Sequence, residues 1–274
     1  MQEMLNRKLP ILLVGLFLFC LPSVAEAELS KEQAYSLFDQ ANQFFRQANS
    51  MASDPDQAQR LYEKTILNYE KIINDGPIRN AMLYYNLGNA YFLKGNLGKA
   101  ILNYRRAEKL GSDREIQKNL DFARDKRIDV LQPKTKKRVL QTLFFWHYDF
   151  SLKTRFLLAC LFFAVSCISL TLMIWSGRRA PTTAGGVVSG ILMVCFLVSV
   201  VLETHYQTTM VCGVITAKEV VAHQADWQNS PPSFKEPLHE GTEFDLIERR
   251  PGWLHIELSD GSDGWIPDSA AALI

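Results

Sequence analysis

The sequence predicts a multidomain membrane protein with an all-α region of helical repeats, two transmembrane helices and a C-terminal all-β domain. Residues 81–114 have the apolar spacing of two packed helices. Residues 156–175 and 184–202 are apolar runs of spanning length, and residues 208–274 change to short alternating stretches separated by turns. A hydrophobic content of 47% and a net charge of +1 indicate neither a disordered chain nor a nucleic-acid-binding protein.

The first residues, 1–27, are predicted to be a secretory signal peptide. Arg7 and Lys8 precede the apolar run Leu9–Leu21, and Ala25-Glu26-Ala27 has the small-x-small pattern of a cleavage site. The apolar run is too short for a comfortable membrane span. We therefore expect the region that follows to be exported.

Residues 81–114 carry seven positions with the pattern large, Leu, Gly, Tyr on one helix and Ala, aromatic, Ala on the next. Gly88 and Ala100 are small where the two helices are expected to approach closely, and the larger side chains fill the space around them. This spacing resembles the tetratricopeptide (TPR) helix–turn–helix repeat, with Ser112 in place of the proline that ends the consensus unit. The resemblance implies structural roles for Tyr84, Leu87, Gly88, Tyr91, Ala100, Tyr104 and Ala107.

A single repeat cannot bury its own face, so its neighbours should be repeats or caps. Residues 34–80 are predicted to be a divergent repeat, because Ile66-Leu67-Asn68-Tyr69 recurs as Ile101-Leu102-Asn103-Tyr104. Residues 115–128 are predicted to be a capping helix, which completes a TPR domain over residues 28–132. In such arrays the first helix of each unit lines the groove. Asn86 and Asn89 are therefore candidate partner-binding residues, and solvated amides are the alternative.

Residues 133–155 are predicted to be a juxtamembrane linker. The linker contains the basic run Lys134–Arg138 and the aromatic run Leu143–Phe150, which is typical of a membrane–water interface. His147 lies in the aromatic run. Simple hydrogen bonding at the interface is the expected role of His147, and a proton-active or ligand role is the alternative.

The transmembrane helices are predicted at residues 156–175 and 184–202, with a short loop at 176–183. Neither predicted span contains a charged residue, so an ion pathway is not expected. Arg178-Arg179 favour a cytoplasmic loop, whereas Lys153 and Arg155 then lie at the outer edge, against the positive-inside rule. Because the number of spans is even, both soluble parts are expected on the same side of the membrane.

The C-terminal part from residue 204 contains four basic and eleven acidic residues, a net charge of −7. Leu238–Thr242, Trp253–Leu258 and Gly264–Pro267 occur in an order that resembles the bacterial SH3-like barrel over residues 208–274. The resemblance implies that Trp253 and Pro267 stand where proline-binding SH3 domains have groove residues, although Ala270 replaces the groove tyrosine. Trp265 is expected in the core. A protein partner and cell-wall material are both left open as ligands.

The whole arrangement resembles the BatE-type proteins of bacterial aerotolerance (Bat) operons, through Asn86-Leu87-Gly88-Asn89-Ala90-Tyr91, Phe145-Trp146-His147-Tyr148-Asp149 and the motifs of the tail. The resemblance implies a component of an envelope complex linked to stress tolerance. Its expected partners are other Bat-operon proteins, including von Willebrand factor A-type membrane proteins. The expected location is the bacterial inner membrane, in two passes, with the TPR and SH3-like domains in the periplasm.

The expected function is that of a non-enzymatic scaffold with protein partners and no nucleic acid. The alternative is a cell-wall-binding sensor or peptidoglycan-associated protein that uses the SH3-like domain for targeting. No nucleophile motif accompanies the histidines, and Cys212 is the only thiol expected in a water-soluble part. We therefore expect no catalytic residue, no metal site and no cofactor.

Overall fold

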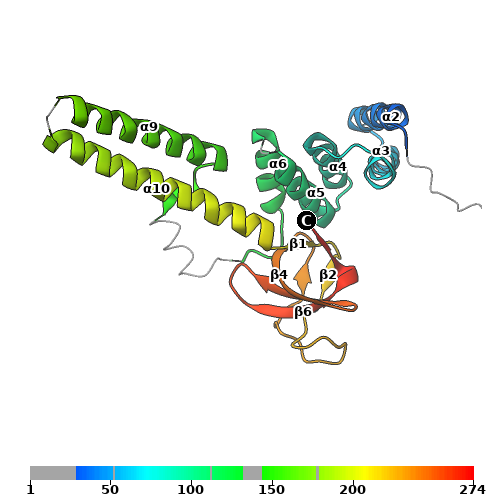
Figure 1. Cartoon of the computed structure of the whole chain (residues 1–274). Coiled ribbons are helices and arrows are strands. Elements are labelled where there is room, and N and C mark those ends of the chain that lie inside the picture. The colour runs from blue at the N-terminus through cyan, green and yellow to red at the C-terminus, as the bar shows by residue number, and fades with distance from the viewer. Residues whose placement is uncertain (1–28, 52, 112, 132–143, 177–178) are drawn as a thin grey trace, which may run out of the picture. The chain divides into compact units, whose positions relative to one another are not determined.

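The computed structural model describes residues 29–51, 53–111, 113–131, 144–176 and 179–274 (Figure 1). The predicted signal peptide and the basic run Lys134–Arg138 lie outside the described residues. The chain forms two compact units, Met1–Arg79 and Asn80–Ile274.

The described part of the first unit is a helical hairpin of α2 (Lys31–Ser50) and α3 (Pro55–Asp75). Ser30 and Gln33 form a capping box at the start of α2. Asp54 caps α3, whose first residue is a proline. The buried face of α2 is made of alanines, against which the larger α3 side chains pack: Ala34, Ala41 and Ala48 on α2, and Tyr62, Thr65, Ile66, Tyr69 and Ile72 on α3.

The second unit begins with three helices, α4 (Ala81–Leu93), α5 (Leu97–Leu110) and α6 (Arg114–Arg124). A side-chain oxygen caps each N-terminus: the capping residues are Asn80, Asn96 and Asp113. Gly95 has φ +81° in the turn between α4 and α5, a conformation that glycine adopts without strain. We call residues 80–131 the helical segment.

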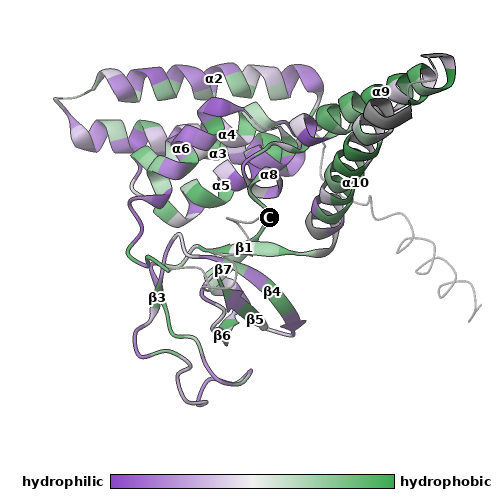
Figure 2. Cartoon of the chain, turned by 90° about the vertical axis from the view of Figure 1, so that its left-hand side faces the viewer, coloured by the Kyte–Doolittle hydropathy of each residue, from purple (hydrophilic) through white to green (hydrophobic). Residues whose placement is uncertain are grey.

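A short helix, α8 (Phe145–Tyr148), precedes the long helices α9 (Leu152–Ser176) and α10 (Arg179–Thr209). Within the described residues, α9 and α10 are the helices long and apolar enough to cross a membrane, over Leu152–Trp175 and Thr183–His205. They lie side by side and are hydrophobic along most of their length (Figures 1 and 2).

The apolar helices are longer than the spans expected from the sequence. They include Lys153, Arg155 and Glu203, so the expectation of spans without charge holds only for their central parts. The packing between the helices is close: a Cβ atom on Gly186 would lie 3.3 Å from Ser169 Cβ, and Ser166 donates a hydrogen bond to Gly186 O.

Residues 212–274, which we call the β domain, form antiparallel strands. The strands are β1 (Cys212–Ile215), β2 (Glu219–Val220), β3 (Leu238–His239), β4 (Glu243–Arg250), β5 (Trp253–Leu258), β6 (Asp263–Pro267) and β7 (Ala271–Leu273), with a 3-10 turn at Asp268–Ala270. In the described part of the chain, one sheet has the order β6-β5-β4-β1-β7, β2 pairs with β3, and neither sheet closes on itself. The hydrophobic core is made of alternate residues from these strands, including Ile215, Leu238, Phe244, Leu254, Ile256, Leu258 and Ile266.

Candidate partner-binding site

The seven signature residues predicted in the helical segment lie in or near the interior of the α4–α5 hairpin. Tyr84 is half-buried, and the other six are buried: Leu87, Gly88, Tyr91, Ala100, Tyr104 and Ala107. A Cβ atom on Gly88 would lie 2.7 Å from two ring atoms of Tyr104 and 3.3 Å from Ala100 O. The glycine therefore lies at a close approach of the two helices, where a larger residue would not fit.

The same tyrosine–asparagine hydrogen bond occurs in the α2–α3 and α4–α5 hairpins. Tyr104 on α5 donates to Asn89 Oδ1 on α4 at 2.7 Å, and Tyr69 on α3 donates to Asn42 Oδ1 on α2 at 2.7 Å. Each asparagine directly follows the small residue of its own helix, Gly88 or Ala41. The two hairpins therefore share a contact as well as a residue spacing.

The predicted site residue Asn89 belongs to an internal hydrogen-bond network. Asn119 Nδ2 on α6 donates to Asn89 Oδ1 at 2.9 Å and to Tyr85 Oη at 3.0 Å. Burial raises the pKa of Tyr104, so its hydroxyl remains a donor at neutral pH. Asn89 thus joins α4, α5 and α6, a structural role that spacing alone did not reveal. Asn86 is half-buried on the same helix.

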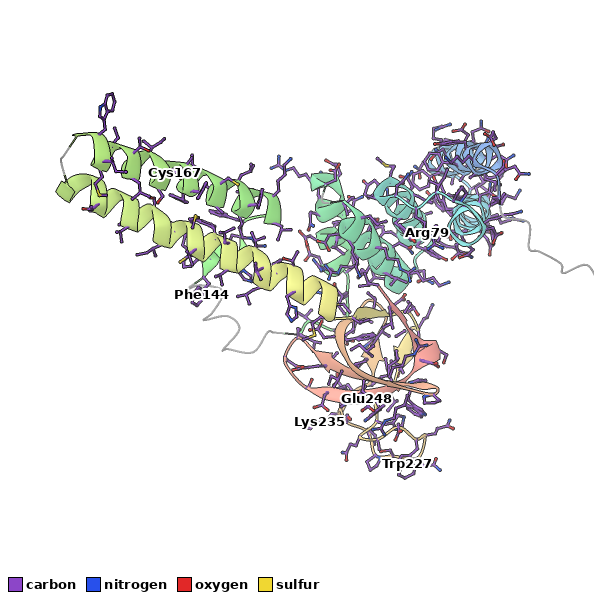
Figure 3. All side chains as sticks on the ribbon, viewed as in Figure 1. Arg79, Phe144, Cys167, Trp227, Lys235 and Glu248 are labelled. Atoms are coloured by element: carbon purple, nitrogen blue, oxygen red, sulfur yellow. The ribbon has the colours of Figure 1, made fainter. Side chains whose placement is uncertain are left out.

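The other predicted pair, Trp253 and Pro267, lies side by side on the β domain. They are directly opposite residues of β5 and β6, and the His223 ring meets the Trp253 ring edge-on with centroids 5.7 Å apart. No sequence motif pointed to His223, which comes from the long loop after β2 and is held by backbone hydrogen bonds to Trp265. Trp227 from the same loop is exposed, and Figure 3 shows it at the lower tip of the β domain.

Trp265 is buried, but on the face of the sheet opposite the hydrophobic core. Its cross-strand neighbour is His255, whereas the core residue Leu254 is opposite Ile266. The Trp265 ring stacks on His255 with centroids 4.6 Å apart, and the Arg250 guanidinium lies 4.6 Å from the ring centroid. The expectation of a core tryptophan is therefore correct for its burial and wrong for the face it occupies.

The edge of this aromatic face is acidic. Arg250 is paired with Glu248 at 2.8 Å and with Asp226 at 2.9 Å, and His255 Nε2 donates to Asp263 at 2.9 Å. The hydrogen bond from Arg250 lowers the pKa of Asp226. The face therefore presents ring edges between carboxylates, a surface suited to contact with a peptide or a polar polymer.

A polar cluster links α8 to the ends of α9 and α10. Arg155, 4% exposed, donates to His147 Nδ1 at 2.9 Å and to Ser199 Oγ at 3.0 Å, and lies 3.7 Å from Glu203. Burial and the neighbouring Arg155 lower the pKa of His147, so the imidazole is neutral and accepts the bond at Nδ1. The arginine that disagreed with the positive-inside rule is thus used in packing rather than as a solvated loop charge.

Metal-ligating side chains do not gather in the described residues. Among them, no three His, Cys, Asp or Glu side chains could hold one metal ion. Burial and the hydrogen bond with Asp245 raise the pKa of the Cys212 thiol to about 11, which leaves little thiolate at neutral pH.

No protein-family model and no curated protein matches this sequence.

Proposed function

We propose that this chain is a membrane-anchored, non-enzymatic scaffold of the bacterial envelope, in which TPR repeats and an SH3-like domain bind protein partners. The observation that carries the proposal is the tyrosine–asparagine contact shared by the α2–α3 and α4–α5 hairpins, at the spacing of the TPR signature. Repeats of this kind present surfaces for other proteins. The two apolar helices supply the anchor.

The β domain supports the same function through its aromatic face. Trp253 and Pro267 lie together beside His223, as groove residues of an SH3-like domain would. The BatE-type resemblance makes other Bat-operon proteins, including von Willebrand factor A-type membrane proteins, the proposed partners. Peptidoglycan is the alternative ligand, favoured by the exposed Trp227 and the ring edges between carboxylates.

Co-purification with partners after crosslinking in cells tests the scaffold proposal. Asn86→Ala and Trp253→Ala should each reduce the recovery of partner proteins. The controls Lys118→Ala and Ile247→Ala should not, because they change exposed residues that take part in none of the contacts described for either candidate surface. Unchanged recovery with both test variants would remove these surfaces from the proposal. If Trp253→Ala instead abolishes binding to purified sacculi while partner recovery is normal, the peptidoglycan alternative replaces it.

The proposed location, with both soluble parts in the periplasm, needs a separate test. A reporter that is active only outside the cytoplasm is fused after Ile274, and a second reporter is fused next to Arg179. We expect activity at Ile274 and none at Arg179. The reverse result would put the partners in the cytoplasm and eliminate every cell-wall ligand.

A further inference from the structure

The helical segment and the β domain, which the two long helices separate in sequence, meet at a half-buried carboxylate. Glu243 at the start of β4 accepts two hydrogen bonds from Arg124 on α6, both at 2.8 Å, and one from Arg127 at 3.2 Å. Arg105 Nε on α5 lies 3.1 Å from the same carboxylate without being aligned for a hydrogen bond. We call these four residues the Glu243 cluster. The side chains are only 22–28% exposed, so the two-point Arg124 pair is partly shielded from water.

A second carboxylate, Asp129, belongs to the helical segment and accepts hydrogen bonds from the β domain. Asp129, which follows α6, accepts hydrogen bonds from the His239 backbone N–H and from the Thr242 hydroxyl, both at 2.6 Å, and from His239 Nδ1 at 2.8 Å. Thr242 is 1% exposed, so the bond satisfies a hydroxyl that water does not reach. Leu131, two residues later, packs against the hydrophobic core of the β domain.

Both ends of α5 also contact the β domain. At its N-terminus the Gly98 N–H donates to Glu240 Oε2 at 3.1 Å, where a helix favours negative charge. A Cβ atom on Gly98 would lie 2.6 Å from Ile215 O, so the helix lies directly on the strand. Near its C-terminus, Arg106 and Lys109 donate to the carbonyl oxygens of Leu273 and Ile274, at 2.9 and 3.2 Å.

We propose that the β domain is the permanent C-terminal cap of the helical segment, held on α5 and α6 by the Glu243 cluster and by Asp129, so that the two parts stay together as one body. An array of packed helices leaves an exposed face at its last helix pair, which needs a polar covering. Here an acidic domain covers a face rich in arginine. The inference rests on these contacts and not on the family or partners proposed above.

Cutting the chain between the two parts tests the cap. A protease site is inserted after Gln132 in the full-length protein, which is then reconstituted into phospholipid vesicles and cleaved. The N-terminal fragment lacks both long helices, so only non-covalent contacts hold it to the vesicles. In the wild-type sequence we expect this fragment to sediment with the vesicles after cleavage.

Charge variants separate the proposed contact from other reasons for retention. Glu243→Arg should release the fragment about tenfold faster or more, because it replaces the carboxylate that pairs with three arginines by a fourth positive charge. The matched control Glu236→Arg makes the same charge change at an exposed residue of the β domain and should not release it. Exchanging the partners, with Arg124→Glu and Glu243→Arg together, should restore retention because one carboxylate again faces the guanidinium groups.

Two results would overturn the cap. One is prompt release of the wild-type fragment, and the other is equal retention of the wild-type and Glu243→Arg fragments. Asp129→Asn is the milder second variant if Glu243→Arg fails to fold as judged by circular dichroism. It keeps the shape of the side chain and should accelerate release through the weaker bonds to His239 and Thr242. Release unchanged by Asp129→Asn would count against the proposal.

Discussion

Adding a single methyl group at Gly88 should destabilise the helical segment. The new Cβ atom would lie 2.7 Å from Cδ1 and Cε1 of the Tyr104 ring, well inside van der Waals contact. The ring cannot easily move away, because Tyr104 is 2% exposed and its hydroxyl is bonded to Asn89 at 2.7 Å. The helices must therefore separate, or the tyrosine must give up its hydrogen bond.

The size of the effect follows from two opposing contributions. Replacing glycine by alanine inside a helix gains about 1 kcal/mol of helix propensity. Overpacking a close-packed site costs about 1–3 kcal/mol, and the upper part of that range applies to a fixed ring at this distance. We expect Gly88→Ala to lower the free energy of unfolding by about 1–2 kcal/mol. Gly88→Leu adds three more carbon atoms and should prevent α4 and α5 from packing.

Urea unfolding of the full-length protein in detergent, followed by circular dichroism, measures this change. The matched control is Gly111→Ala, whose new Cβ atom would meet Ala81 Cβ at 3.4 Å, an ordinary contact, and which should change stability by less than about 0.5 kcal/mol. Tyr104→Leu should reduce the cost of Gly88→Ala, since the two sites are in contact. The reasoning is refuted if Gly88→Ala is as stable as Gly111→Ala.

Three further predictions concern ionisable groups. Burial by itself would raise the pKa of Glu243, but the Arg124 hydrogen bond and the charges of the three arginines lower it by more. The folded-state pKa of Glu243 therefore lies below its usual 4.5. The ionised Glu243 carboxylate should stabilise the folded protein fully above pH 4.5, and this stabilisation should be lost as the pH falls through the folded-state pKa. Glu243→Gln should therefore flatten the acid side of a plot of melting temperature against pH. Cys212, with a pKa of about 11 against an ordinary 9.0, should react about a hundredfold more slowly with iodoacetamide at pH 8 than an exposed thiol, as judged by peptide mass spectrometry. Arg155→Met should lower the melting temperature in detergent by several degrees, because it removes the hydrogen bonds of this 4%-exposed guanidinium to His147 and Ser199 and its charge contact with Glu203. The exposed Lys153→Met should have little effect.

Local spacing was enough to predict the interior of the α4–α5 hairpin. Residues four and three positions apart share one helix face, so the run from Tyr84 to Tyr91 defines a buried stripe without any knowledge of the rest of the chain. The same holds for β5, where Leu254, Ile256 and Leu258 alternate with more exposed neighbours. In both cases the burial of a residue depends mainly on its own element.

The sequence could not predict contacts between distant elements. Asn89 looked available to a partner because its acceptor role toward Tyr104 and Asn119 depends on two other helices. Trp265 looked like a core residue because composition does not distinguish the two faces of a sheet, one filled with aliphatic side chains and the other covered by His255 and Arg250. Alternation along β6 was the available signal, and the strand is too short to make it clear.

Charges in two distant parts of the sequence, at Glu243 and Arg155, are both held by internal partners. The C-terminal part has a net charge of −7, yet one of its carboxylates, Glu243, is paired with arginines more than a hundred residues earlier. Under the positive-inside rule, Arg155 favoured the orientation opposite to the one that the export signal requires. In the structure, however, Arg155 donates hydrogen bonds to Ser199 and His147 at the end of the helix pair. A charge held by an internal partner is a poor guide to ligands or to topology, because it is not free to interact with solvent or lipid.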